Sequence, residues 1–267
     1  MISKNKFYEY ITEKKYDLVK DHKVHNAVIL AAGESKRFRP ISEYCPKGLS
    51  YIKGEILIER QIKQLQAVGI ADVSVIVGYK KELFYYLARK YNVSIIVNEL
   101  YDKQDNLTSL KLASNKLSNT YICSVDNYYP LNPFNSHEYR GYYPTVHIPT
   151  QTHEWIVKCD EDGIINNVQI GGLGGNVLLG FVYFDQYFSD EFKRIIEETA
   201  DYDIYNHHVW EFLYIQHLSR LKLEAKPFPP DRIVEFDSID DAIIYDPDFL
   251  LNNDESHFRT RQMNKEL

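Results

Sequence analysis

The residues best suited to chemistry are a glycine and two basic side chains that follow an apolar run near the N-terminus. The run Ala27–Leu30 leads through two alanines to Gly33, and small residues let backbone N–H groups approach phosphate oxygens. Arg37 adds a planar fork of donors that suits phosphate. Lys47 follows on a loop that Pro46 stiffens. This segment predicts a binding site for a phosphate-bearing molecule.

Two other phosphate-binding patterns fit the sequence less well. A dinucleotide-binding turn needs G-x-G-x-x-G, whereas Gly33 is followed by the basic residues Lys36 and Arg37, so NAD is disfavoured. The glycine-rich run Gly171–Gly175 lacks the Lys and Ser/Thr of a P-loop and stands between expected strands. We interpret that run as a flexible turn.

Elements that alternate between strand and helix must position the basic residues. Short apolar runs and helical spacings predict strands at 27–30, 73–77, 94–97 and 121–125, separated by helices at 56–68, 81–91 and 109–117. This alternation indicates an α/β fold with a Rossmann-like, doubly wound and mostly parallel sheet. Ligands of such sheets bind beyond the carboxyl ends of the strands, which is where Gly33 lies.

The pattern changes after Pro130. Antiparallel strands are expected within 142–170, with a turn at 160–163, followed by helices at 189–199 and 204–221 and a last strand at 233–236. A short amphipathic helix is expected at 3–20. We therefore expect an N-terminal helical extension (1–24), one main domain (25–250) with a small antiparallel β insertion at about 140–180, and a frayed polar tail (251–267).

Composition excludes several classes of protein. The chain of 267 residues has a net charge of −7 and no long basic run, which argues against binding of nucleic acid. Its 3 cysteines show no metal-binding spacing and suit a reducing compartment. No apolar run is long enough to span a membrane, and the N-terminus does not read as a signal peptide. We expect a cytoplasmic protein, whose oligomeric state stays open.

At this point the motifs resemble a known group. Leu30-Ala-Ala-Gly-x-x-x-Arg-Phe-x-Pro, followed by Pro46-Lys47-x-Leu49, resembles the signature of the sugar-phosphate nucleotidyltransferase superfamily. From about His25 to about Asp246 the chain is similar to one branch, the bacterial CTP:phosphocholine cytidylyltransferases of the LicC type. Many members have glycine where this chain has Ser35, which leaves the detailed path of the loop open.

The resemblance implies a reaction and roles for individual residues. A phosphate or phosphonate oxygen would attack the α-phosphorus of a nucleoside triphosphate and expel pyrophosphate. Catalytic roles fall to Arg37, facing the pyrophosphate, and to Lys47, bridging the phosphates. Base recognition falls to Gly78, Tyr79, Asn106 and Ser109, and the resemblance favours CTP without excluding UTP. The implied nucleotide-binding set is Leu30, Ala31, Ala32, Gly33, Glu34, Gly78, Tyr79, Asn106 and Ser109.

A magnesium ion is expected beside these groups, because Mg²⁺ prefers hard oxygen ligands. Asp126 ends the fourth expected strand, although a carboxylate there could also be a helix cap or simply solvated. The resemblance pairs it with Asp237 as the second metal ligand. Glu235 and Asp240 stand close in sequence and could be mistaken for that second ligand.

The residues expected to bind the acceptor lie in the second half of the chain. A quaternary ammonium donates no N–H hydrogen bond, so aromatic faces and carboxylates must hold it. By resemblance these are Glu154, Trp155, Tyr183, Asp203 and Tyr205, although Trp155 and Tyr183 could instead be core aromatics. The leading acceptor is phosphocholine, 2-aminoethylphosphonate is a close rival, and a sugar 1-phosphate comes third. A non-catalytic nucleotide-binding module is the remaining alternative.

Overall fold

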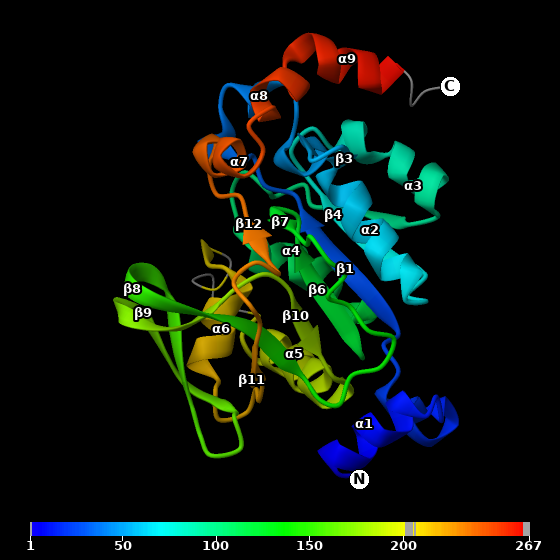
Figure 1. Ribbon diagram of the computed structural model, residues 1–267, viewed down its shortest axis with the longest axis vertical. Coiled ribbons are helices and arrows are strands. Elements are labelled where there is room, and N and C mark those ends of the chain that lie inside the picture. Colours follow the sequence, from blue (N-terminus) through cyan, green and yellow to red (C-terminus); the bar gives the residue numbers. More distant parts are fainter. Residues whose placement is uncertain (1, 201–204, 206, 264–267) are drawn as a thin grey trace.

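A parallel sheet forms the centre of the molecule. The computed structural model describes residues 2–200, 205 and 207–263. Strand β1 (Asn26–Ala31) lies between β4 (Asp72–Val77) and β6 (Thr120–Ser124), and β5 (Ser94–Val97) pairs with the far side of β4 (Figure 1). All four are parallel, because helical crossovers connect them. The four strands expected from the sequence are therefore confirmed.

Antiparallel strands extend the sheet beyond β6. Strand β10 (Val182–Phe184) pairs with β6, and β8 (Tyr142–Cys159) pairs with β10. Strand β9 (Ile165–Leu178) returns along β8, and β11 (Glu224–Pro227) forms the edge. The expected doubly wound α/β fold with an antiparallel β insertion is confirmed.

Helices cover both faces of this sheet and divide the core in two. On one face lie α2 (Leu57–Ala67) and α3 (Tyr86–Tyr91), and on the other lie α4 (Asn106–Leu112), α5 (Gln186–Glu198) and α6 (Trp210–Gln216) (Figure 1). Side chains of β1 alternate between the two cores: Ile29 packs in the first and Val28 in the second. This alternation is why β1 is apolar along its length.

Small elements complete the main domain. The strand pairs are β2 (Tyr51–Ile52) with β3 (Glu55–Ile56), and β7 (Asn127–Tyr128) with β12 (Val234–Glu235). Short 3-10 helices occupy Lys36–Phe38, Ile41–Glu43, Lys47–Leu49, Lys81–Phe84 and Ser114–Lys116. No helix of the described residues is long and apolar enough to cross a membrane.

The single helix expected at 3–20 was wrong. The structure has α1 (Lys4–Thr12), a turn with Lys14 at positive φ, and a 3-10 helix at Tyr16–His22. The break changes which side chains point inward, so that Val19 is fully buried while Leu18 is exposed. Phe7 fixes the extension to the main domain by packing on His22 and Tyr139.

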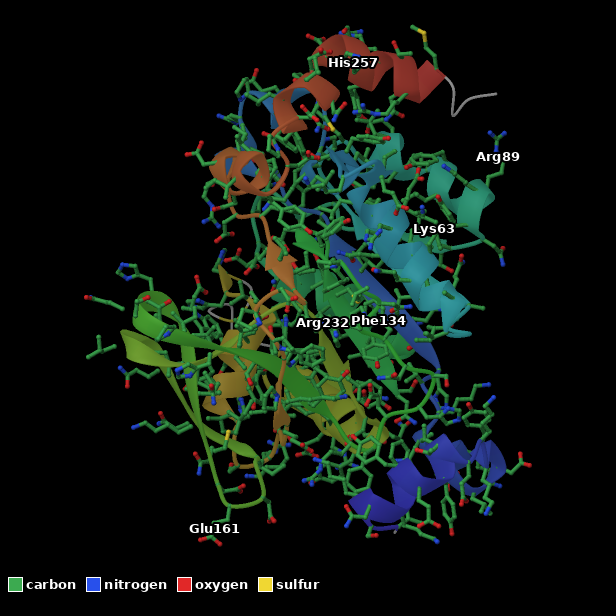
Figure 2. The ribbon with its side chains drawn as sticks, in the orientation of Figure 1. Lys63, Arg89, Phe134, Glu161, Arg232 and His257 are labelled. Atoms are coloured by element: carbon green, nitrogen blue, oxygen red, sulfur yellow. The ribbon has the colours of Figure 1, made fainter. Side chains whose placement is uncertain are left out.

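Two further expectations were wrong. The run Gly171–Gly175 is part of β9 rather than a turn: its glycines adopt positive φ and let the strand bulge against β8. The main domain ends in α7 (Ile239–Tyr245) and α8 (Phe249–Asn252), and the described part of the expected frayed tail (251–267) instead holds the end of α8 and all of α9 (Glu255–Met263), which His257 marks in Figure 2. Phe258 of α9 is buried and packs on Tyr44.

Helix α6 is also shorter than the expected 204–221, of which 204 and 206 lie outside the described residues.

Candidate active site

Two adjoining hollows lie at the carboxyl ends of β1 and β6. The first has a volume of about 210 Å³, and the second, of about 300 Å³, shares Gly33 and Lys47 with it. Of the residues predicted from the sequence, the first is lined by Leu30, Ala32, Gly33, Lys47, Asn106, Ser109 and Asp126, and the second by Gly33, Glu34, Arg37, Lys47 and Asp237. The structure thus brings the two halves of the predicted set to one edge of the sheet.

Lys47 is the buried cation of this edge. Its Nζ donates to the Phe236 carbonyl oxygen at 2.7 Å and lies 3.3 Å from Asp126 Oδ2. The ammonium also stands 4.9 Å from the centre of the Phe38 ring, and the residue is only 7% exposed. These contacts fix the charge in a place where water reaches it poorly, so it acts more strongly on a nearby phosphate than a solvated lysine would.

Three carboxylates crowd together next to Lys47. One oxygen each from Asp126, Glu235 and Asp237 lies within 4.8 Å of the others. Pairing of β7 with β12 causes this convergence, since Asp126 precedes β7 while Glu235 ends β12. Burial, together with the charges of Asp126 and Asp237, raises the pKa of Glu235 to about 8. A divalent cation would relieve that repulsion, and three carboxylate oxygens suit such an ion.

Arg37 and Asp237 join the phosphate-binding loop to the C-terminal part of the domain. Arg37 Nη2 lies 2.9 Å from Asp237 Oδ1, and both side chains are largely exposed. An exposed ion pair of this kind is weakly held, so either partner can turn to a ligand at little cost. Arg37 therefore stands at the open mouth of the site, whereas Lys47 lies at its floor.

The turn from Gly33 to Lys36 leaves room for phosphate. A Cβ at Gly33 would meet nothing within 4 Å, so the space beside its α-carbon is open. Ser35, the position where the family often has glycine, adopts the left-handed φ of 52°. The backbone here thus takes the conformation that glycine allows most easily, and the loop keeps its shape with serine at a small cost in strain.

Of the residues expected to read the base, Asn106 and Ser109 line the smaller hollow, whereas Gly78 and Tyr79 do not. Gly78 lies against Tyr101 and the Ala32 carbonyl oxygen, with no room for a Cβ, and Tyr79 N donates to that oxygen at 2.9 Å. Asn98 Nδ2 donates to Ser109 Oγ at 3.0 Å, which orients the hydroxyl. Gly78 and Tyr79 support the loop from behind rather than line the hollow, and Ala31 ends β1 beneath it.

The acceptor residues are only partly assembled by the described chain. Glu154 is exposed, and its charge contributes to the raised pKa of Glu235, which places it near the carboxylates. Trp155 and Tyr205 are partly buried and pack on the second core. Asp203 lies outside the described residues.

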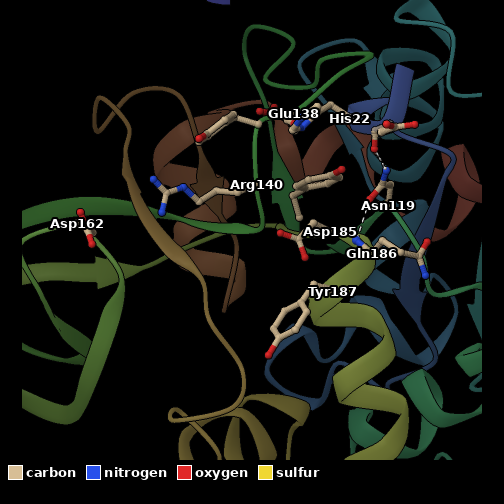
Figure 3. A pocket seen from close by; sticks show the side chains of 11 residues that line it. His22, Asn119, Glu138, Arg140, Asp162, Asp185, Gln186 and Tyr187 are labelled. Atoms are coloured by element: carbon tan, nitrogen blue, oxygen red, sulfur yellow. Dashed lines mark hydrogen bonds between the residues drawn. The ribbon is translucent and has the colours of Figure 1, made fainter. Parts of the chain in front are cut away.

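Tyr183 is not part of this site. It pairs with Tyr121, at the beginning of β6, whereas Asp126 follows the end of that strand. Its ring is 1% exposed and packs on Tyr142. It lines a different hollow, of about 470 Å³, which lies between the N-terminal extension and the start of α5 (Figure 3). We therefore leave Tyr183 out of the proposed acceptor site.

Sequence reasoning missed some residues that the structure places here. Glu235 belongs to the carboxylate group, although it was considered only as a possible confusion with Asp237. Tyr101 and Asp105 line both hollows. Position in sequence, between the strand at 94–97 and Asn106, was the only available signal for the latter two.

Comparison with known proteins agrees with this geometry. Residues 27–129 match the model of the MobA-like NTP transferase domain. The choline-phosphate cytidylyltransferase of Streptococcus pneumoniae is 31% identical over 215 residues, which are 80% of this chain and 94% of the relative. The 2-aminoethylphosphonate cytidylyltransferase of Lancefieldella rimae is 28% identical over 83% of this chain and 92% of the relative.

A solved structure extends the comparison to three dimensions. It is that of the CTP:phosphocholine cytidylyltransferase of Streptococcus pneumoniae, LicC, with a TM-score of 0.78 and 31% identity. The match covers 81% of this chain and 95% of that structure. Fold and site together define a nucleotidyltransferase, an enzyme that moves a nucleotidyl group from a nucleoside triphosphate to an acceptor. Within that class, the chain belongs to the family of the LicC-type cytidylyltransferases.

Proposed function

We propose that the protein transfers CMP from CTP to phosphocholine, forming CDP-choline and pyrophosphate. The observation that carries this proposal is the convergence of Lys47, Arg37 and three carboxylates on a hollow lined by Asn106 and Ser109. The names of two relatives, both choline-phosphate cytidylyltransferases, support the choice of nucleotide and acceptor. We place the reaction in the cytoplasm, where CTP is available.

Nucleotidyl transfer to an anionic acceptor requires neutralisation of the phosphate charges rather than a strong base. A phosphate oxygen of the acceptor, already an anion at neutral pH, forms a bond to the α-phosphorus. The bond from that phosphorus to the bridging oxygen breaks, and the electron pair leaves with pyrophosphate. Lys47, next to Asp126, would neutralise charge near the reacting phosphorus, and Arg37, next to Asp237, would meet the departing pyrophosphate.

Mg²⁺ is our proposed cofactor. Asp126, Glu235 and Asp237 would hold it, and the group they form offers only hard oxygen donors. When bound, the ion supplies positive charge to the triphosphate. Base recognition would come from Ser109, held by Asn98, and from Asn106, whose amide could meet the exocyclic groups of cytosine.

A second acceptor, 2-aminoethylphosphonate, is favoured by one observation. Glu154 is an exposed carboxylate near the carboxylate group, and a primary ammonium can donate hydrogen bonds to such an oxygen, whereas a quaternary one cannot. A relative that carries this activity in its name supports the alternative.

Pyrophosphate release tests both acceptors. The protein is incubated with CTP and Mg²⁺ and with phosphocholine, 2-aminoethylphosphonate or glucose 1-phosphate in turn, and UTP replaces CTP in parallel reactions. We expect the highest kcat/KM with CTP and phosphocholine. Faster turnover of the phosphonate would overturn the choice of acceptor, and no turnover with any acceptor would overturn the enzymatic proposal.

A further inference from the structure

A carboxylate outside every predicted set lies close to the site. Glu211 is the second residue of α6, and the helix begins where the Trp210 amide donates to Asn106 Oδ1 at 2.8 Å. Because Asn106 lines the nucleotide hollow, this bond fixes the start of α6 to the wall of the active site. Glu211 is thus positioned by a residue of the site itself.

The two oxygens of Glu211 have different surroundings. Oε1 accepts a hydrogen bond from the Tyr143 hydroxyl at 3.2 Å, and the Tyr143 ring stacks on Trp210 with centroids 5.9 Å apart. Oε2 is buried and accepts no well-formed hydrogen bond from the residues that the structure describes, although the Glu211 backbone N–H and the Trp210 side chain lie close enough to lower the pKa of the carboxyl. A buried carboxylate oxygen without a donor is costly, so the protein gains nothing from it unless a ligand supplies the missing partner.

The bond between Trp210 and Asn106 places the start of α6 on the wall of the hollow that Asp126 also lines, and the electrostatics of Glu211 agree with this position. Burial raises the pKa of Glu211 to about 7, and the charge of Asp126 adds to this effect. The charge of Glu235 likewise adds to the raised pKa of Tyr143. The charges of the carboxylates that we assign to the metal therefore act on Glu211 and Tyr143, which belong to α6 and β8.

The curl of the β8–β9 hairpin brings the proposed acceptor residues to the same side. Ile156 pairs with Val177, and Val177 also pairs with Val146 in the first half of β8. Trp155 is thereby carried back toward the part of the strand that holds Tyr143, and it packs on the core that contains Tyr143 and Trp210. The hairpin leaves the sheet and bends back on itself in Figure 1, and Glu161 marks its tip in Figure 2.

We propose that Glu211 is an acceptor-binding residue, whose Oε2 faces the ammonium group of the acceptor and selects cationic acceptors over neutral ones of the same shape. The inference rests on the proposed function and adds a specificity residue to it. Tyr143, which donates to Oε1, and Trp155, which packs on the same core, supply aromatic faces of the kind that such a cation prefers, and Glu211 supplies the charge.

Acceptors that differ only in charge test this role. Phosphocholine and 3,3-dimethylbutyl phosphate have the same shape, but the second carries a neutral carbon in place of the quaternary nitrogen. We expect the wild-type protein to prefer phosphocholine, and Glu211→Gln to raise the KM for phosphocholine by about 10- to 100-fold. The KM for the neutral analogue and for CTP should change less than about threefold, because neither meets the lost charge.

Control variants separate binding from folding. Glu211→Asp, which keeps the charge, should restore part of the preference. Tyr214→Phe removes another buried, unpartnered oxygen of the same helix and should leave both KM values unchanged. Parallel assays of Glu211→Gln with 2-aminoethylphosphonate show how Glu211 contacts the ammonium group. A larger rise in KM for this acceptor than for phosphocholine means that Oε2 accepts an N–H hydrogen bond, and an equal rise means that Glu211 provides charge alone.

The outcomes distinguish this inference from the proposed function. If wild-type protein transfers CMP to neither acceptor, the proposed function fails. If the wild-type protein is active but Glu211→Gln keeps its preference for the cationic acceptor, or loses activity equally with both analogues, the role of Glu211 is refuted while the function stands.

Discussion

Lys47 combines burial with three electron-rich neighbours. The Phe236 carbonyl oxygen, Asp126 and the face of Phe38 surround an ammonium that is 7% exposed. Taking an ammonium out of water is costly, and these contacts offset part of that cost. The result is a positive charge that is already in place before substrates arrive, which is the form of electrostatic stabilisation that contributes most to catalysis.

Removing this charge should slow the reaction. We expect Lys47→Gln to lower kcat by about 10²- to 10³-fold, as the loss of one preorganised donor does elsewhere. The measurement is the rate of pyrophosphate release at saturating substrates. Lys116→Gln is the control, because Lys116 forms only a surface ion pair with Asp72. A kcat within fivefold of wild type would contradict the role that we assign to Lys47.

Glu211 should make stability depend on pH. Its pKa is raised from 4.5 to about 7 in the folded protein, so the native state binds its proton more tightly than the unfolded chain does. The stability this proton contributes is present below pH 4.5 and is lost as the pH rises through about 7.

A neutral side chain at this position should remove that dependence. Without substrates, we expect Glu211→Gln to match wild type near pH 4.5 and to be more stable by up to about 3 kcal/mol above pH 7. Urea unfolding of both proteins across this pH range measures the difference between their free energies of unfolding. Glu235 and the other titrating groups are present in both proteins, so their contributions cancel in this difference. A difference that stays constant with pH would show that Glu211 titrates normally.

At the scale of elements, close packing of backbone segments sets the position of Lys47. The 3-10 helix Lys47–Leu49 lies against the residue before Asp126, and a Cβ at Gly48 would come within 2.5 Å of Val125 Cγ2. Glycine is therefore required here by contact, although its φ is not positive. The lysine and its carboxylate partner are held together because the Val125 side chain packs directly on the backbone of Gly48.

Gly48→Ala should push these two segments apart. We expect a loss of about 1 to 3 kcal/mol in the free energy of unfolding, since the clash is with a branched, partly buried side chain that packs on the core. A kcat at least about 10-fold lower should accompany it, because small displacements of a catalytic group are costly. Thermal unfolding and steady-state kinetics measure the two effects.

Two further variants give this prediction its controls. Gly48→Ala combined with Val125→Ala removes the clashing methyl groups and should recover part of the lost activity. Gly33→Ala meets nothing within 4 Å, so it should fold normally while raising the KM for CTP, since its methyl enters the space left for phosphate. Unchanged kinetics in Gly48→Ala would show that Lys47 is positioned by other contacts.

At the scale of the whole molecule, the sequence predicted what depends on local pattern. The parallel strands are continuous apolar runs, so they could be located before the structure, and so could the loop after β1. The grouping of Glu235 with Asp126 depends on pairing of β7 with β12, and the distance of Tyr183 from the site depends on the register of β10. Long-range pairing of this kind leaves no periodic signal in the sequence.

The C-terminal segment was misjudged for a related reason. Helix α9 is polar, and Phe258 is its only fully buried side chain within the described residues. Its attachment depends instead on the polar residue Asn253, which is fully buried before α9 begins. Asn253 Nδ2 donates to the Tyr51 carbonyl oxygen at 2.7 Å, and its Oδ1 accepts from Tyr51 N at 2.7 Å. A polar residue in a polar segment gives no indication that it is buried.

Asn253 therefore provides a test of whether the C-terminal segment is part of the folded domain. Its carbonyl oxygen also accepts from the Tyr44 hydroxyl at 2.9 Å, which ties the loop between Arg37 and Lys47 to this segment. We expect Asn253→Ala to lower the free energy of unfolding by about 2 to 4 kcal/mol, because the Tyr51 N–H and carbonyl oxygen both lose the side chain that pairs with them.

Chemical denaturation measures this loss against Leu251→Ala, a neighbouring change at a side chain that is 63% exposed and should alter stability by less than about 0.5 kcal/mol. Well below the unfolding temperature, Asn253→Ala should keep kcat within a few-fold of wild type, since the residue touches neither hollow. Equal stability of the two variants would mean that α8 and α9 are not docked as described. A large loss of kcat in a folded Asn253→Ala protein would instead make the C-terminal segment a support of the phosphate-binding loop, acting through Tyr44.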